Sequence, residues 1–242
     1  TRLPVRHAFT TKFGGVSAGP CESLNLGFGR GDTEENVRKN YALLADALGV
    51  PAARFTLTKQ IHEDEVSVVS EQESGMGLQS DAIITALGDT PLVGFGADCV
   101  VTLLYDPAAR VCGVCHAGWR GTAKGILGKT VAQMAEKLGA HPETMVAVMG
   151  PSIHQECFET DSDVPCEAER LLGAMVRPFV MEKGEKFHVD LQGVNAALLA
   201  RAGLRPENIV DSGLCTMCEH QTFWSHRHTN GVRGVQAGVI CL

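Results

Sequence analysis

Residues 100–115 read VVTLLYDPAARVCGVC, and they hold two apolar runs of strand length separated by the turn signal Asp106-Pro107. The runs Val100–Tyr105 and Val111–Cys115 are too apolar for strands that expose one face to water. We therefore expect both strands inside a sheet that is covered on its two faces, and we expect the rest of the chain to supply that cover.

Outward from this stretch the same patterns predict more strands and several helices. Further strands are expected at Val66–Val69, Leu92–Phe95, Met145–Met149 and Val235–Ile240. A helix is expected at residues 32–48, with Asp32 as N-cap and Glu35 completing a capping box. Further helices are expected at residues 122–138, at 165–175, and from residue 190 to before Gly203. No internal repeat, linker or break in composition divides the chain. We predict one α+β domain over residues 1–242, with layered mixed β-sheets covered by helices.

The composition is that of a globular protein with an acidic balance. Hydrophobic residues make up 44% of the 242 residues and charged residues 20%, which argues against extended disorder. The 21 Lys and Arg against 28 Asp and Glu give a formal charge of −7. Proteins that coat nucleic acids need clustered cations, so we expect no nucleic-acid partner. A small anion would have to be captured by a local arginine or by backbone N–H groups.

The nine cysteines are odd in number and too sparse for a disulfide scaffold. No apolar run approaches the roughly 18 residues of a membrane span, and no leader pattern is visible. We expect free thiols, a reducing cytoplasmic compartment and no membrane partner.

Two cysteine pairs match short motifs without the context that those motifs need. Cys112-Gly-Val-Cys115-His116 has the spacing of covalent haem attachment. On a strand, however, Cys112 and Cys115 point to opposite faces, so one porphyrin edge cannot reach both thiols. The pair Cys215-Thr-Met-Cys218 would complete a four-cysteine zinc site with the first pair, but the two pairs are far apart in sequence. We interpret all four as buried or loop thiols.

The residues around Cys99 are a stronger candidate for a site. Asp98-Cys99 falls between two apolar strands, where a polar pair is poor core filler. Residues 116–121, His-Ala-Gly-Trp-Arg-Gly, lead from a strand into a helix, and Arg120 there offers a fork for a phosphate or carboxylate. Lys59-Gln-Ile-His62 puts another histidine at an element boundary. From spacing alone, a role as a hydrogen-bonded structural residue is the better explanation for each of these residues.

Taken together, these motifs resemble the YfiH/laccase-domain family, and the resemblance covers nearly the whole chain in order. Members of that family are described as polyphenol oxidoreductases and as purine nucleoside phosphorylases. The motifs that carry it are Asn25-Leu-Gly27, Gly31-Asp32, Asn40, Lys59-Gln-Ile-His62, Ser80-Asp81-Ala82-Ile83, Ala97-Asp98-Cys99, His116-Ala-Gly-Trp-Arg-Gly121, Gly150-Pro151-Ser152-Ile153 and Phe223-Trp-Ser-His-Arg227. The resemblance implies a single YfiH-like domain.

The resemblance also implies a metal centre. By motif position, His62, Cys99 and His116 would bind one zinc ion and act in catalysis, with Asp81 as a further catalytic residue for proton transfer or ribose recognition. Three protein ligands with an open fourth position are the pattern of a catalytic rather than a structural zinc site. Copper in place of zinc stays open, because this chain carries Cys112 and Cys115 where the family has apolar residues, and both are soft ligands.

For activity, the resemblance implies phosphorolysis of adenosine, inosine and methylthioadenosine, together with deamination of adenosine. The partners would be a nucleoside and phosphate as small-molecule substrates. The protein itself would be a monomer or a homodimer. We expect Arg120 and the N–H groups of residues 118–122 to bind the anion, and Gln60 and Asn40 to contact the substrate.

Two other activities remain open. One is a copper-dependent polyphenol oxidase (laccase), although His226-Arg-His228 is the one H-x-H pair in the sequence and a four-copper site needs several. The other is an editing hydrolase of a peptidoglycan precursor, with Cys99 as its nucleophile.

Overall fold

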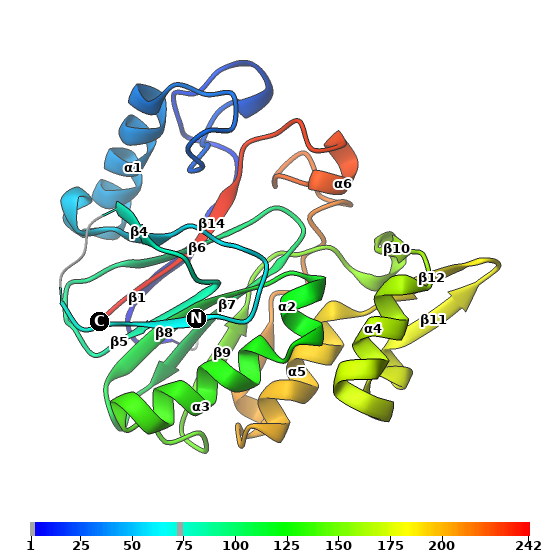
Figure 1. Ribbon diagram of the computed structural model, residues 1–242. Helices are drawn as coiled ribbons and strands as arrows, with labels where there is room; N and C mark the ends of the chain where they lie inside the picture. The colour runs from blue at the N-terminus through cyan, green and yellow to red at the C-terminus, as the bar shows by residue number, and fades with distance from the viewer. Residues whose placement is uncertain (1–2, 72–74) are drawn as a thin grey trace.

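The computed structural model of the protein describes residues 3–71 and 75–242, and Figure 1 shows two β-sheets at the centre with helices around them. Within the described residues the strands form these two sheets and a small third one. Strand β1 (Arg6–Phe9) pairs antiparallel with the last strand, β14 (Gln236–Cys241), so that Arg6 lies opposite Cys241.

The six-stranded sheet contains the stretch with which the sequence analysis began. Its order is β13 (Ile209–Asp211), β9 (Val146–Met149), β7 (Val100–Asp106), β8 (Val111–Ala117), β5 (Ala82–Thr85) and β3 (Val66–Val69). Strands β7 and β8 are antiparallel, with Val100 opposite Ala117 and Asp106 opposite Val111. Every residue of both strands is buried, so the prediction of a sheet covered on both faces is confirmed.

The five-stranded sheet lies against it. Its order is β1 (Arg6–Phe9), β14 (Gln236–Cys241), β6 (Leu92–Gly96), β2 (Thr56–Thr58) and β4 (Gly75–Leu78). Pairing in this sheet is antiparallel from β1 through β14 to β6 and parallel between β6, β2 and β4. The six-stranded sheet also combines both kinds, with parallel pairs at its two edges and antiparallel pairs between them, so both large sheets are mixed. A buried cluster that includes Leu103, Val114, Leu92 and Ile240 joins the two sheets.

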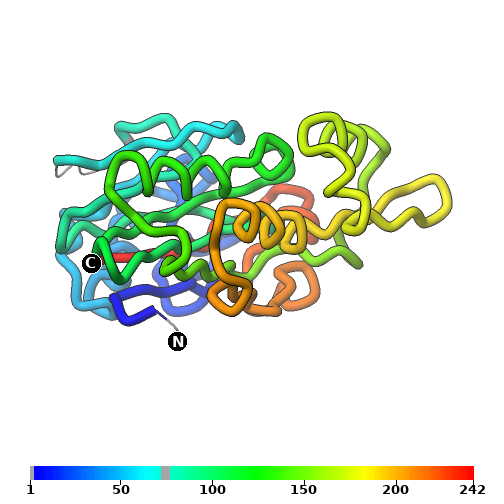
Figure 2. The backbone as a smooth tube through the Cα atoms, turned by 90° about the horizontal axis from the view of Figure 1, so that it is seen from below, coloured from blue at the N-terminus to red at the C-terminus, as the bar shows by residue number. Residues whose placement is uncertain are grey.

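Helices cover the outer faces, which gives the order helix, sheet, sheet, helix. Helix α1 (Glu34–Leu48) packs on the five-stranded sheet through Val37, Tyr41 and Leu44. Helices α3 (Ile126–Leu138) and α5 (Leu191–Arg201) lie across the six-stranded sheet, as the view from below in Figure 2 shows. The predicted fold class, layered mixed sheets covered by helices, is confirmed.

The predicted helix boundaries needed two corrections. Helix α1 has Thr33 as its N-cap, whose hydroxyl accepts from the Asn36 N–H; the carboxylate of Asp32 instead accepts from Ser17 and Asn25. The predicted helix 122–138 is two helices, α2 (Trp119–Ala123) and α3, because Gly125 between them has φ of +74°, in the left-handed region.

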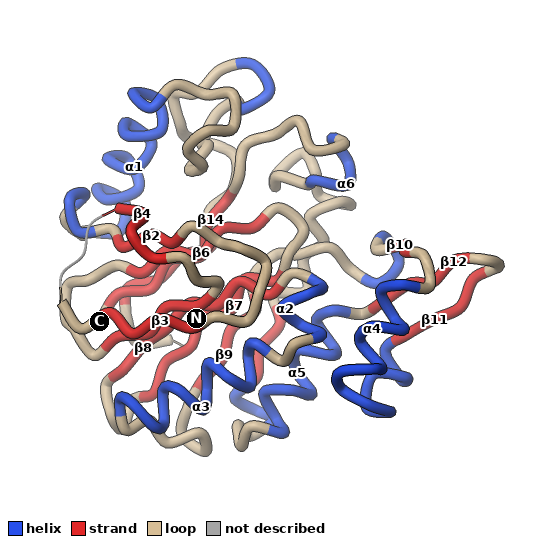
Figure 3. Tube along the Cα trace, viewed as in Figure 1, coloured by secondary structure: helices blue, strands red, loops and turns tan. Residues whose placement is uncertain are grey.

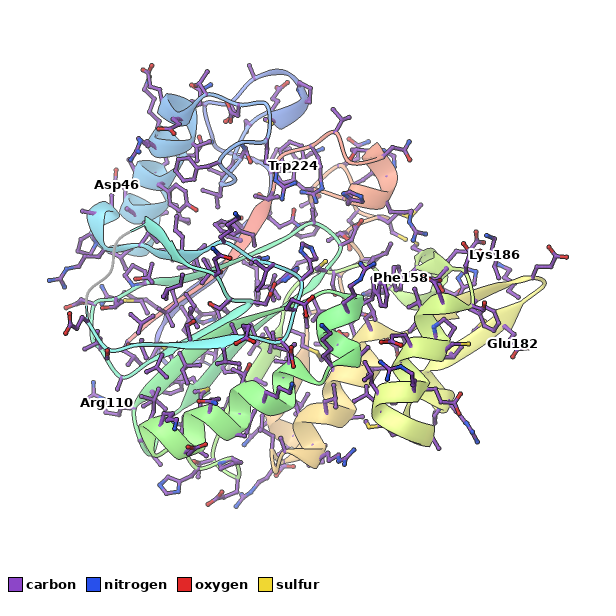
Figure 4. The ribbon with its side chains drawn as sticks, viewed as in Figure 1. Asp46, Arg110, Phe158, Glu182, Lys186 and Trp224 are labelled. Atoms are coloured by element: carbon purple, nitrogen blue, oxygen red, sulfur yellow. The ribbon has the colours of Figure 1, made fainter. Side chains whose placement is uncertain are left out.

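An arm extends from one end of the sheets (Figure 3). It consists of helix α4 (Asp163–Leu172), the 3₁₀ helix η4 (Gly173–Phe179) and a three-stranded sheet of β10 (Glu159–Thr160), β12 (Lys186–Val189) and β11 (Val180–Lys183). Glu182 and Lys186 lie near its outer end (Figure 4). The predicted helix 165–175 is thus α4 and the first turn of η4.

The shorter elements complete the chain. They are η1 (Gly19–Cys21), η2 (Ala52–Arg54), η3 (Gln155–Cys157), η5 (Pro206–Asn208) and α6 (His226–Thr229). Short strands such as β1, β2 and β5 were not predicted, because they span only three or four residues and owe their form to the neighbours with which they pair. Across the described ranges, none of the helices has the length and apolar character needed to cross a bilayer.

One buried carboxylate makes a testable contribution to the stability of this fold. Asp106 at the end of β7 is fully buried, and it accepts hydrogen bonds from the N–H groups of Ala108, Ala109 and His141 and from the Thr144 hydroxyl. Burial alone would raise the pKa of Asp106, but these hydrogen bonds outweigh it and the pKa lies below its usual value. We expect Asp106→Asn to lower the free energy of unfolding at pH 7 by about 2–4 kcal/mol, because the amide turns an N–H group toward these donors.

The pH dependence has a defined sign. A depressed carboxyl pKa contributes stability above the unfolded value of about 3.9, and this contribution is lost as the pH falls through the folded value. Urea unfolding should therefore show a difference between wild type and Asp106→Asn that is largest near neutrality and shrinks below about pH 4. A constant difference across this range would contradict the assignment.

Candidate metal centre

The structure brings together three residues that the sequence separates widely. His62 lies in the loop after β2, Cys99 in the turn between β6 and β7, and His116 near the end of β8. One ligand atom from each lies within 4.8 Å of the others. His62 is exposed, Cys99 is half-buried and His116 is buried, so the cluster opens toward solvent on the His62 side.

This convergence follows from the way the chain crosses between the sheets. Strand β6 belongs to the five-stranded sheet and β7 to the six-stranded one, so the turn that carries Cys99 spans the edge of the sandwich. His116 on β8 pairs with Val101 on β7, which places it beside that turn. His62 and Asp98 have φ values of +59° and +90°, a conformation that non-glycine residues adopt only where the surroundings hold them.

Asp81 holds two of the three residues in place. Its carboxylate lies 2.9 Å from His116 Nδ1 and accepts from the backbone N–H groups of Ile61, His62 and Glu63. The His116 Nδ1 is therefore engaged, and Nε2 is the ring nitrogen that remains for a metal. Asp81 is 3% exposed with both oxygens occupied. These contacts let Asp81 position His116 and the His62 loop, and its part in proton transfer or ribose recognition stays a prediction.

The charges of the cluster suit a metal ligand set. Burial opposes ionisation of Cys99, but His116 and His62 outweigh it and lower the pKa of the thiol to about 6. Burial likewise opposes protonation of His116, while Cys99 and Asp81 raise its pKa to about 9. The lowered pKa of Cys99 favours its thiolate, which is the form of cysteine that binds metals.

Gly118 leaves space over the cluster. A Cβ atom at this position would lie 3.2 Å from Cys99 Sγ, 3.5 Å from His62 Cδ2 and 3.7 Å from His116 Cε1. The glycine therefore keeps a side chain away from the Cys99 sulfur and from the two imidazole rings. Two imidazoles and one thiolate with free space beside them fit the donor set of a catalytic zinc site.

Positive charge near the cluster comes from a residue that the sequence analysis did not single out. Arg233 is partly buried, and its pKa lies below the usual value. Burial is the main cause and the charge of Arg30 adds to it, whereas the charges of Cys99 and Asp98 act in the opposite direction. Its Nε is buried without a hydrogen-bond partner among the described residues, and one of its terminal nitrogens lies 3.4 Å from His226 Nδ1. In sequence Arg233 is remote from every motif residue of the cluster, so nothing local marks it.

Arg120, the predicted anion ligand, is the second residue of α2 and is exposed, with its guanidinium 4.2 Å from the centre of the Trp119 ring. Its role in anion binding stays a prediction. The N–H of Thr122 donates to the Gly118 carbonyl within the helix, so it is not available to an anion.

Asp98 ties a distant loop to the cluster. Its carboxylate accepts from the Thr216 hydroxyl at 2.7 Å and from the Arg227 N–H at 2.6 Å. The loop that follows β13 is thereby fixed next to Cys99. The polar Asp-Cys pair was notable in the sequence, but its partners lie more than a hundred residues later.

Comparison with known proteins agrees with this architecture. A family model described as multi-copper polyphenol oxidoreductase laccase matches residues 6–242. The chain belongs to this laccase family. A crystal structure of the YfiH protein of Bacillus licheniformis superposes with a TM-score of 0.94 at 32% identity, covering 98% of this chain and 92% of that one.

Two relatives of the laccase-family chain carry names of nucleoside enzymes. A Deinococcus radiodurans protein named purine nucleoside phosphorylase is 42% identical over 240 residues, covering 99% of this chain and 90% of that protein. A protein from an unknown prokaryotic organism, named adenosine deaminase RL5, is 34% identical over 231 residues, covering 91% and 87%.

In this laccase-family chain, Gln60 and Asn40 both make hydrogen bonds within the chain, and their contact with substrate stays a prediction. The Gln60 amide accepts from the Phe95 N–H and donates to the Phe95 carbonyl, which ties its loop to β6. Asn40 is fully buried on α1, where its amide bonds the backbone of Val16 and Asn25 and the Ser17 hydroxyl.

Cys112 and Cys115 are fully buried on opposite faces of β8, which confirms the argument against haem attachment. Burial raises the pKa of both thiols. Neither belongs to a group of candidate metal ligands within the part of the chain that the structure describes. Both thiols are buried away from solvent, and a role for them as extra soft ligands for copper stays a prediction.

A cavity of about 410 Å³ lies elsewhere, beside α5, and is lined by His154, Gln192 and Asp211 among others. None of the predicted site residues lines it.

Proposed function

We propose that the protein is a zinc-dependent purine nucleoside enzyme. It would phosphorolyse adenosine, inosine and methylthioadenosine to the free base and ribose 1-phosphate, and it would also deaminate adenosine. The observation that carries the proposal is the meeting of His62, Cys99 and His116 at one open edge of the sheets. The names of the two relatives support the substrate class.

The three residues would hold the zinc ion, and Asp81 would orient His116 toward it. When bound, zinc would act as a Lewis acid that activates water or polarises a substrate atom. Asp81 also fixes the His62 loop, and Asp98 fixes the loop on the other side, so the ligands need little rearrangement on binding.

Phosphorolysis requires a phosphate oxygen to bond to the sugar carbon while the bond to the purine breaks and the base leaves with the electron pair. The phosphate must therefore be held next to the sugar by positive charge. Arg233, with Arg30 and His226 beside it, offers this charge close to Cys99. Arg120 at the start of α2 is the second candidate.

All nine cysteines lie within the described residues, and each is a free thiol. This suits the reducing cytoplasmic compartment that we propose for the protein.

A direct assay tests the proposed activity. Zinc-loaded protein is incubated with adenosine with and without phosphate, and adenine, inosine and ribose 1-phosphate are resolved by chromatography. Adenine and ribose 1-phosphate should depend on phosphate, whereas inosine should not. Parallel arms with copper-loaded protein and a phenol, and with a muropeptide precursor, cover the other two activities. No nucleoside product alongside turnover in either of these arms would refute the proposal.

The position of the phosphate gives a separate prediction. We expect Arg233→Ala to raise the KM for phosphate by about 10-fold, the equivalent of one charged hydrogen bond. Adenosine deamination, which uses no phosphate, should change much less. The comparison variant is Arg120→Ala, measured in the same two assays. If Arg120→Ala raises the KM for phosphate and Arg233→Ala does not, the anion binds at the start of α2.

A further inference from the structure

A second cluster of thiols lies outside the candidate metal centre. Cys157 ends η3, and Cys215 and Cys218 lie in the loop between β13 and α6. Their sulfur atoms all lie within 4.8 Å of one another, and those of Cys157 and Cys218 are 3.4 Å apart. The pair 215–218 has the C-x-x-C spacing, and the fold adds a third cysteine from a distant segment.

The separations match those of a tetrahedral metal site. Zinc–sulfur bonds of about 2.3 Å place neighbouring sulfur ligands about 3.8 Å apart, within the range of this cluster. Backbone N–H groups also face the Cys215 sulfur: that of His154 lies 3.4 Å away, and those of Met217 and Cys218 interact with it too. Such N–H groups stabilise a thiolate, the form that binds metals.

The cluster is accessible from one side. Cys215 is buried, Cys157 is half-buried and Cys218 is exposed. An ion can therefore enter past Cys218 without opening the core, and a solvent molecule can occupy a fourth position.

We propose that Cys157, Cys215 and Cys218 form a zinc site with three thiolate ligands, distinct from the centre at His62, Cys99 and His116. Soft thiolates favour zinc over the hard cations magnesium and calcium. This inference does not depend on the proposed nucleoside activity.

The bound metal would have a structural role, because it would join the 215–218 loop to η3. Arg227 connects its surroundings to the other centre: one terminal nitrogen donates to the Cys157 carbonyl at 3.2 Å, and its backbone N–H donates to Asp98 next to Cys99. Its guanidinium also lies 5.5 Å from the centre of the Phe158 ring, which Figure 4 labels. A metal joining the 215–218 loop to η3 would hold this connection together.

Cobalt(II) is a suitable probe, because thiolate ligands give it intense charge-transfer absorption that imidazole ligands do not. The test uses the reduced 242-residue chain with Cys99→Ala, which removes the one thiolate of the other centre. We expect one cobalt ion per chain with the thiolate absorption, and its displacement by zinc. Adding Cys218→Ser should weaken cobalt binding at least about 10-fold. Cys166→Ser on α4, which removes an exposed cysteine outside the cluster, is the matched control.

Thermal melting provides a second readout. Zinc should raise the melting temperature of the Cys99→Ala chain, and it should raise it less when Cys157→Ser or Cys218→Ser is added. The absence of thiolate absorption in the Cys99→Ala chain would overturn the proposal. Absorption that survives both Cys157→Ser and Cys218→Ser unchanged would overturn it as well.

Discussion

Cys99→Ala should remove one bound metal ion per chain and lower kcat/KM for phosphorolysis and deamination by more than about 1,000-fold. The loss should exceed the roughly 10–100-fold effect of removing a residue that only supports a ligand, because Cys99 is itself a metal ligand. Cys99 is the one thiolate of the centre, and its partners His62 and His116 are neutral imidazoles when they bind a metal. Metal content is measured by elemental analysis after dialysis, and turnover by the chromatographic assay.

Cys112→Ala is the control for this experiment. Cys112 is also a cysteine close in sequence to His116, but it is fully buried between the sheets. The variant should keep its metal and its turnover. If Cys112→Ala loses the metal and Cys99→Ala keeps it, the assignment of ligands is wrong.

Asp81→Asn should weaken metal binding at this centre by about 10–100-fold, the usual effect of removing a hydrogen-bond partner of a metal-binding histidine. The effect has two sources, since Asp81 orients His116 and also accepts from the N–H groups of residues 61–63. An asparagine amide at this site would turn an N–H group toward donors. Zinc affinity is measured by competition with a coloured chelator.

Asp64→Asn is the matched variant, because Asp64 lies in the same loop but pairs with Lys129 on α3. It should change the zinc affinity by less than about twofold, as expected for a partly exposed ion pair. Equal losses in both variants would show that loop charge, rather than the orientation of His116, decides the affinity.

Much of the fold was predictable because the burial of a strand or helix determines the pattern of apolar residues along it. Strands β7 and β8 are buried on both faces, and their residues are apolar on both, so the sequence around residues 100–115 reads as sheet interior. Helix α5 begins close to residue 190, where the sequence predicts it, and Asp190 is its N-cap, with a carboxylate that accepts from the Gly193 N–H. The break at Gly125 was not predictable from periodicity, since apolar residues continue on both sides of it.

Some residues of the two candidate sites could be predicted from the sequence and others could not. The sequence motifs marked His62, Cys99, His116 and Asp81, whereas the four hydrogen-bond partners of the Asp81 carboxylate appear only in the tertiary structure. Arg233 and Cys157 carry no local signal.

By itself the sequence determined the layered class of the fold and the residue types available for chemistry, because amphipathic periodicity and turn residues act over a few positions. Only the tertiary structure decided which cysteines meet. The strand pattern could separate Cys112 from Cys115, but it could not show which distant cysteine lies near another. Cys157 and Cys218 are 61 residues apart, yet their sulfur atoms lie 3.4 Å from each other, because the packing of η3 against the loop after β13 sets their positions.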